Sequence, residues 1–444
     1  MANIERPRFS CMLGGVLATL SAMPRTIPII HGAQGCGGNL ASVFSLGGYL
    51  GAGYCGNTAV PSSNIGESDI IFGGGDRLIR EINSTFEVMD GDLFVVTTTC
   101  MTDIIGDDIK GILNEVGDKD KPILFVDAGG FKGNSYYGYS VLMQELFVQY
   151  IPKSEKKNKK LVNILGLVPG YDPYFRGDLE EVQRILGLLG IEATTFFTHD
   201  QTQEKIKRAG EAALNIVFSR LYGTSAAETA KETHGIDYWV TELPIGSVAT
   251  VKFIRELAQK LELDQALVDA VIEKETDSYY KYIDRATDLI ADTDFQNYAI
   301  VIANGTEALA YAKYLDGEIG WVVNYIFVTD ELTDEQKAVI REAFEEIEFA
   351  QRPKLVFETD TYSIQQTIGR EDPQFKLDRY YEKISPAFVL GSTIDKKLAT
   401  VLNGFLLSIS FPVINRIIVS RGYAGFRGGL SLLEDLIGAQ IAGR

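Results

Sequence analysis

Several residue types are scarce in this chain of 444 residues. It has three histidines, two tryptophans and four cysteines, and no cysteine follows residue 100. Basic residues are also in deficit, because 42 Lys and Arg stand against 60 Asp and Glu, which gives a net charge of −18. This charge argues against a nucleic-acid binder, which needs a basic face. It argues equally against docking on an anionic membrane surface.

Long apolar runs are missing as well. A membrane-spanning helix needs about 18 or more consecutive apolar residues, and the sequence contains no such run. The first ten residues lack the basic-then-apolar layout of a signal peptide. We therefore expect a cytoplasmic protein with no membrane contact. At roughly 150 residues per domain, the length indicates about three domains.

The four cysteines are crowded into the first quarter of the chain, at Cys11, Cys36, Cys55 and Cys100. A disulfide scaffold would be small, secreted and dense in cysteine, and this chain is none of these. Buried structural thiols would be scattered over the whole length. The clustering therefore makes a metal or redox site a candidate, with four buried structural cysteines as the alternative.

Apolar stretches of strand length alternate with helical patterns in three successive rounds. A basic run at 153–160 separates the first round from the second, and a long helical stretch ends the second. We predict domains at 1–155, 156–294 and 295–444. The expected strands are 69–72, 93–96 and 123–126 in the first round, 161–168, 192–197, 213–218 and 238–241 in the second, and 298–303, 321–328, 354–357 and 387–390 in the third.

Continuous apolar strands that alternate with helices are typical of buried parallel sheets. The predicted fold class is therefore α/β, with three Rossmann-like domains. Such a sheet does not imply a nucleotide. The sequence has neither a G-x-G-x-x-G followed by an acidic residue about 20 positions on nor a Walker A motif.

Three of the cysteines, Cys11, Cys36 and Cys100, lie in glycine-rich or strand-end contexts. Their separations of 25 and 64 residues are too long for a zinc knuckle or a bacterial ferredoxin run. They suit ligands that separate loops bring together. Soft thiolates favour an iron–sulfur cluster, and neighbouring glycines let backbone N–H groups reach the sulfurs. A cluster normally has four or more thiolate ligands, so either Cys55 or a second subunit would complete this one.

Four patches stand in order along the first part of the chain: Cys11 before a glycine-containing helix start, His31-Gly-Ala-Gln-Gly-Cys36, Ile71-Phe72-Gly73-Gly74, and Thr98-Thr99-Cys100-Met101 with Ile105-Gly106-Asp107-Asp108. In these patches the chain resembles the β-type subunit of the nitrogenase component 1 family. The likeness spans nearly the whole chain, with the tightest match in the first 110 residues or so and weaker matches at 244–246, 411–416 and 422–425.

The resemblance implies three Rossmann-like domains per subunit and an α2β2 heterotetramer. It implies that Cys11, Cys36 and Cys100 ligate a P-cluster-type [8Fe-7S] cluster shared with an α subunit, which holds the catalytic cluster. It also implies that an ATP-dependent iron protein docks near Phe72, although a buried phenylalanine at a strand end is the alternative. We expect neither His199 nor His234 to be a metal ligand.

Departures from the family pattern keep other functions open. Gly130 aligns with a serine that ligates the oxidised P-cluster in the family, and a glycine has no side chain to do so. Glycines also follow Cys36, and the N-terminal extension of molybdenum-type β subunits is absent, which favours a nitrogenase-like reductase such as a methylthio-alkane reductase. Cys55 is expected to be a bystander. The alternatives are a cofactor-assembly scaffold and a tetrapyrrole reductase subunit with a [4Fe-4S] cluster.

Overall fold

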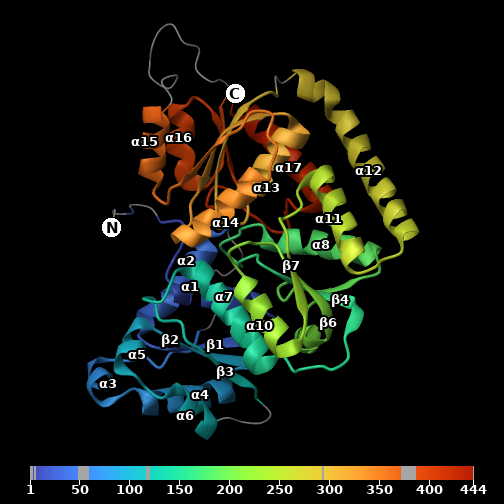
Figure 1. Ribbon diagram of the computed structural model, residues 1–444. Coiled ribbons are helices and arrows are strands. Elements are labelled where there is room, and N and C mark those ends of the chain that lie inside the picture. Colours follow the sequence, from blue (N-terminus) through green and yellow to red (C-terminus); the bar gives the residue numbers. More distant parts are fainter. Residues whose placement is uncertain are drawn as a thin grey trace.

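Three separate parallel sheets organise the chain (Figure 1). The computed structural model describes residues 4, 7–48, 60–116, 121–292, 295–371 and 387–443. The first sheet has the order β1-β2-β3, formed by Thr26–His31, Leu93–Thr98 and Ile123–Val126. All six residues of β2 are buried, which explains why this strand is a continuous apolar run in the sequence.

The second and third sheets are also parallel throughout. The second has the order β5-β4-β6-β7, formed by Glu192–Thr194, Asn158–Leu165, Ala212–Val217 and Asp237–Val240. The third has the order β10-β9-β8-β11-β12, formed by Lys354–Phe357, Val322–Val328, Tyr298–Ala303, Ala387–Gly391 and Phe405–Ser408. The predicted α/β fold class is confirmed, whereas the exact domain boundaries stay predictions.

Helices cover the sheets and join them to one another. Those around the first sheet are α1 (Met12–Ala22), α2 (Gly38–Leu46), α3 (Glu67–Phe72), α4 (Gly75–Val88), α5 (Cys100–Ile105), α6 (Ile109–Val116) and α7 (Ser135–Glu145). Those that follow are α8 (Phe175–Leu188), α9 (Gln203–Lys207), α10 (Thr224–His234), α11 (Gly246–Lys260) and α12 (Gln265–Asp292). The last are α13 (Ala308–Tyr314), α14 (Asp334–Glu345), α15 (Thr361–Glu371), α16 (Lys396–Val401) and α17 (Gly425–Ala442).

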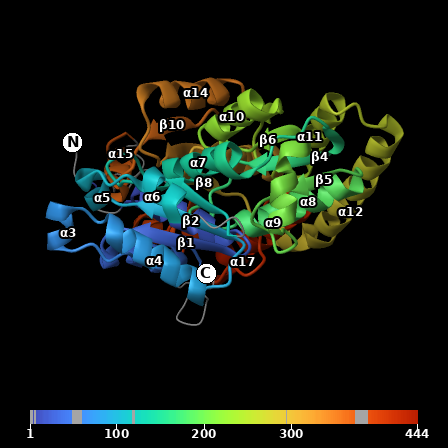
Figure 2. The same ribbon diagram turned by 90° about the horizontal axis from the view of Figure 1, so that it is seen from below.

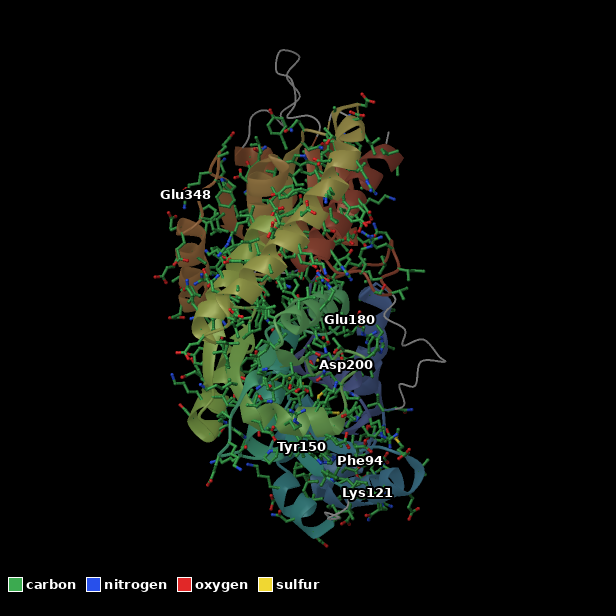
Figure 3. The ribbon with its side chains drawn as sticks, turned by 90° about the vertical axis from the view of Figure 1, so that its right-hand side faces the viewer. Phe94, Lys121, Tyr150, Glu180, Asp200 and Glu348 are labelled. Carbon is green, nitrogen blue, oxygen red and sulfur yellow. The ribbon has the colours of Figure 1, made fainter. Side chains whose placement is uncertain are left out.

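The largest apolar core runs through all three parts of the chain. Helix α7 packs against both α1 and α10, and α17 packs against α8, α11 and α12. The first sheet and α3 to α6 form one end of the molecule, and α12 lies on the opposite side (Figures 1 and 2). Tyr150 is labelled in Figure 3, and its hydroxyl donates a hydrogen bond to the side chain of Gln203 at 2.8 Å. The Gln203 amide in turn donates to the hydroxyl of Thr26 at 2.9 Å, so hydrogen bonds connect α9 to the start of β1.

One local prediction is wrong. The segment 69–72 is not a strand, because α3 spans Glu67–Phe72 and the Asp69 carboxylate accepts a hydrogen bond from the backbone N–H of Gly66 at 2.8 Å. An acidic group in this position stabilises the start of a helix. Two helices, α5 and α6, follow β2, since Gly106 adopts a left-handed conformation with φ of 77° and ends α5. No helix among the described ranges is long and apolar enough to cross a membrane.

Candidate metal centre

Three segments bring Cys11, Cys36 and Cys100 to one edge of the first sheet. Cys100 begins α5 directly after β2, and Cys36 lies in a 3-10 turn that follows β1. Strands β1 and β2 are neighbours that run parallel, with His31 opposite Thr98 at their carboxyl ends. The two cysteine segments therefore leave the sheet side by side, at the edge where parallel sheets generally place their sites.

Cys11 comes to the same edge because its segment pairs with the loop before α7. Cys11 and Asn134 form an isolated antiparallel bridge. The N–H of Met12 donates to the carbonyl of Gly133 at 3.0 Å, and the N–H of Ser135 donates to the carbonyl of Ser10 at 2.9 Å. This pairing holds the loop 129–134 beside the Cys11 thiol.

Gly130 lies between two of the thiols. Its backbone N–H donates to the Sγ of Cys100 at 3.2 Å. A Cβ added at Gly130 would lie 2.9 Å from the Sγ of Cys100 and 3.9 Å from the Sγ of Cys11. Glycine therefore supplies a backbone donor to a sulfur here and leaves the space between the sulfurs free, with no side-chain ligand to add.

The third thiol is close enough to interact electrically with the other two. Burial first, and then the charges of Cys11 and Cys100, raise the pKa of Cys36 above its usual value. Like charges in a shared site oppose each other's ionisation, and a bound metal would reverse that preference by stabilising the thiolates. All three cysteines are free and half-buried.

The chemistry of the donor set fits an iron–sulfur cluster. Among the described residues, no group of three or more His, Cys, Asp and Glu side chains is arranged to hold a metal ion. Soft thiol donors are nevertheless the ligands that iron–sulfur clusters take, and three of them come to one edge of the sheet. Cys55 lies outside the described residues, so its distance from this site is not defined.

The site opens onto a groove of about 830 Å³ beside Cys11. Gly130, Phe131 and Tyr137 line it from one side, and Leu332 and Gln336 line it from the other. Phe131 is 77% exposed, although a large apolar side chain is usually buried in an isolated protein. The groove thus leaves one side of the thiol site accessible to another chain.

A second exposed apolar surface lies near the site, on α3 and α5, which pack against each other. We call Ile71, Phe72 and Ile104 the α3–α5 patch, and they are 74%, 86% and 72% exposed. Phe72 was expected to be either an exposed docking residue or a buried strand-end residue, and the buried alternative is wrong. Sequence reasoning missed Ile104, because apolar spacing alone does not tell which helix face lacks a neighbour.

The two later histidines lie away from any arrangement of ligands. His234 is buried, with its Nε2 at 3.0 Å from the carbonyl of Ile151 and its Nδ1 at 2.7 Å from the hydroxyl of Thr233. His199 is exposed. The expectation that neither residue binds a metal stays a prediction.

Comparison with known proteins gives a consistent family and fold. The family model for nitrogenase component 1 type oxidoreductases matches residues 11–440. The chain is 26% identical over 306 residues to a nitrogenase molybdenum-iron protein beta chain of Bradyrhizobium diazoefficiens, covering 60% of this chain and 57% of that one. It is 25% identical over 347 residues to a light-independent protochlorophyllide reductase subunit of Heliobacterium modesticaldum, covering 75% and 63%.

These matches span less than two thirds of the length of both relatives. The solved structure titled "Nitrogenase Cp1 at pH 6.5" superposes with a TM-score of 0.80 at 19% identity, covering 100% of this chain and 94% of that one. A likeness at this identity shows the fold alone, and it agrees with the three sheets described above.

Proposed function

Because the chain belongs to the family of nitrogenase component 1 type oxidoreductases, we propose that it is the β-type subunit of a nitrogenase or nitrogenase-like reductase. In this proposal Cys11, Cys36 and Cys100 hold a P-cluster-type [8Fe-7S] cluster together with an α-type subunit in an α2β2 heterotetramer. Electrons from an ATP-dependent iron protein pass through this site to a catalytic cluster on the α-type subunit. The observation that carries the proposal is the convergence of the three thiols: Gly130 lies between those of Cys11 and Cys100, and the thiol of Cys36 interacts with both.

The chain's own part in the reaction is to hold the thiolate ligands and to stabilise their negative charge. Cys11 precedes α1 and Cys100 begins α5, so both sulfurs lie near helix N-termini, which stabilise negative charge. The N–H of Gly130 adds a hydrogen bond to the sulfur of Cys100, and such bonds tune the potential of an iron–sulfur centre. When bound, the cluster supplies the electron-transfer chemistry, and the protein supplies position and electrostatics.

The placement of the catalytic cluster on the partner has separate support. The chain has no cysteine after Cys100. The carboxyl ends of β4, β8 and β9, where parallel sheets usually bind ligands, are followed by buried polar residues that bond to one another. The Asn304 amide donates to Asp172 at 2.6 Å, and the Asp330 carboxylate accepts from the Gly305 N–H at 2.5 Å. These polar side chains are buried at the carboxyl ends of the strands.

One experiment tests the proposal against the alternatives. The chain is purified with its co-encoded α-type partner, its iron is counted, and EPR spectra are recorded in reduced and oxidised forms. Iron that matches an [8Fe-7S] cluster per αβ pair, in addition to a separate cluster on the partner, supports the proposal. A single [4Fe-4S] signal contradicts it and favours a tetrapyrrole reductase. Iron that leaves the complex for an acceptor protein contradicts it and favours an assembly scaffold.

The α3–α5 patch is the surface we propose for docking of the iron protein. Replacing Phe72 with alanine in the complex should raise the iron protein concentration needed for half-maximal reduction about tenfold, because truncating a central interface aromatic costs on the order of 1–2 kcal/mol. The maximal rate should stay within about twofold. The readout is substrate reduction at increasing iron protein concentration.

Val88 provides the matched control for this prediction. It is 84% exposed and apolar like Phe72. It is, however, the last residue of α4, a helix of 14 residues whose first residue, Gly75, is the one near Phe72 in the sequence. Val88→Ala should leave both the half-saturating concentration and the maximal rate unchanged. Equal effects of the two substitutions would show that the patch is not the docking surface.

A further inference from the structure

Two side chains, the buried His31 and the half-buried Asp107, join the α3–α5 patch to the thiol site. His31 is the last residue of β1, five residues before Cys36, and its side chain is fully buried. Asp107 follows the helix that begins with Cys100. The Nε2 of His31 lies 3.0 Å from the Oδ2 of Asp107. The contact therefore connects the segment of one cysteine to the segment of another.

The hydrogen bonds around His31 define which nitrogen carries the proton. Burial lowers the pKa of His31, against the opposing effects of Asp107 and Asp69, so the ring is neutral at pH 7. A carboxylate only accepts hydrogen bonds, so Nε2 carries the hydrogen and donates to Asp107. Nδ1 then accepts from the hydroxyl of Ser63 at 3.0 Å, and this hydroxyl accepts from the N–H of Gly32 at 3.1 Å. The ring is held from both sides.

On the other side, Asp107 holds the loop that follows Phe72. Both of its carboxylate oxygens accept from the N–H of Gly74, at 3.0 and 3.1 Å. A Cβ added at Gly74 would lie 2.5 Å from the Cδ1 of Ile65 and 3.1 Å from the Cε1 of His31, so the loop backbone packs directly on the ring. Because packed groups deform little, a displacement of the backbone at Gly74, two residues after Phe72, would be opposed by Asp107 and His31.

The main chain of His31 is bound to the Cys100 helix as well. The hydroxyl of Thr102, two residues after Cys100, donates to the carbonyl of His31 at 2.9 Å. It also accepts from the N–H of Thr99 at 2.9 Å, at the start of α5. The hydrogen-bonded unit of His31, Asp107 and Thr102 thus contacts three parts of the chain. These are the loop that follows Phe72, the segment that leads to Cys36, and the first turn of the helix that begins with Cys100.

We propose that His31 and Asp107 are positioning residues that transmit iron protein docking at the α3–α5 patch to the thiolates of Cys36 and Cys100, and so set the rate of electron transfer within the docked complex. This inference rests on the proposed function. It adds that docking affinity and electron transfer are separable in this chain. The α3–α5 patch sets the affinity for the iron protein, and the His31–Asp107 pair sets the rate of electron transfer. Neither His31 nor Asp107 is a catalytic residue, because each acts through the cysteine segments.

The test compares Asp107→Ala with Asp108→Ala in the assembled complex. Asp107 contacts His31 and Gly74, whereas its neighbour Asp108 accepts from the N–H of Gly111 at 2.9 Å and stabilises the start of α6. Iron content, the EPR spectrum of the resting complex and the rate of reduction at increasing iron protein are measured for both. For Asp107→Ala we expect intact iron and EPR, an unchanged half-saturating concentration, and a maximal rate lowered about tenfold or more.

Asp108→Ala should match the unsubstituted complex in all of these measurements. Asp107→Asn keeps one oxygen that accepts from His31 and should recover part of the rate, which also guards against a variant that fails to fold. The proposal is overturned if Asp107→Ala behaves like Asp108→Ala, if it changes only the half-saturating concentration, or if it loses iron. Failure of the proposed function is a different result, because the unsubstituted complex would then lack the cluster or the iron-protein-dependent activity.

Discussion

Replacing Cys100 with alanine is expected to remove the iron of the shared cluster from the αβ complex and to abolish reduction that depends on the iron protein. The substitution removes a thiolate that no other side chain replaces, because Gly130 beside it has no donor atom of its own. The fold should survive, since the bond between Thr99 and Thr102 that starts α5 does not use the sulfur. The bond from the N–H of Gly130 that is lost costs on the order of 1 kcal/mol. Iron analysis with EPR, the rate of reduction that depends on the iron protein, and circular dichroism of the purified complex measure these three expectations.

Cys55→Ala is the matched control for Cys100→Ala. Cys55 was predicted to be a bystander, and it lies outside the described residues. The Cys55→Ala complex should keep its full iron content and activity. If iron instead falls by a whole cluster in this variant, the three-cysteine assignment is wrong and Cys55 is the fourth ligand within one chain. If Cys100→Ala keeps its iron, Cys100 is not a ligand at all.

Several strands of the three sheets could be predicted from the sequence. The expected segments 123–126 and 298–303 agree with β3 and β8, and 93–96 lies within β2. Such strands are continuous apolar runs, and alternation with helices indicates parallel pairing. The same rule failed at 69–72, where Ile71 and Phe72 are apolar but exposed. An apolar run therefore does not by itself indicate a buried strand.

The candidate site was predictable in part. Motif context singled out Cys11, Cys36 and Cys100, and the family resemblance pointed to Gly130, which lies between two of the thiols. The role of Asp107 was not predictable, because its partners Gly74 and His31 are 33 and 76 residues away. A one-dimensional pattern of loop residues does not show which carboxylate reaches which backbone N–H.

A buried group of acids could not be predicted from the sequence either, because its members come from three separate segments: Asp172 with Asp178, Glu307, and Asp330. All four side chains are buried where the second and third sheets meet the C-terminal part of the chain. The Asp178 carboxylate accepts from the N–H groups of Tyr423 and Ala424, and the Asp330 carboxylate accepts from the hydroxyl of Tyr222. Glu307 differs: in the described part of the chain, neither of its carboxylate oxygens has a hydrogen-bond partner.

This arrangement makes the stability of the protein depend on pH. Burial first, and then the charges of Asp172, Asp178 and Asp330, raise the pKa of Glu307 well above its usual range. Burial likewise raises the pKa of Asp172 and of Asp178 to about 7, and that of Asp330 to about 6. The folded state therefore binds more protons than the unfolded state once the pH exceeds the ordinary carboxyl pKa of about 4. The contribution of these carboxyl groups to the stability of the fold is fully present below that pH. It is lost as the pH rises through their pKa values in the folded state.

Replacing Glu307 with glutamine should remove much of this pH dependence. Glutamine has nearly the same shape but no charge, and it also relieves the repulsion on Asp172, Asp178 and Asp330. Each proton that the folded state retains and the unfolded state releases lowers stability by about 1.4 kcal/mol per pH unit, so Glu307→Gln should melt at a clearly higher temperature than the unsubstituted complex at about pH 8 and at nearly the same temperature at about pH 5. Thermal melting of the purified complex at both pH values measures the difference. The exposed Glu342, replaced in the same way, should change stability by less than about 0.5 kcal/mol at either pH. Equal melting of the Glu307→Gln and unsubstituted complexes at about pH 8 would contradict the prediction and show that Glu307 is solvated or paired in the assembled protein.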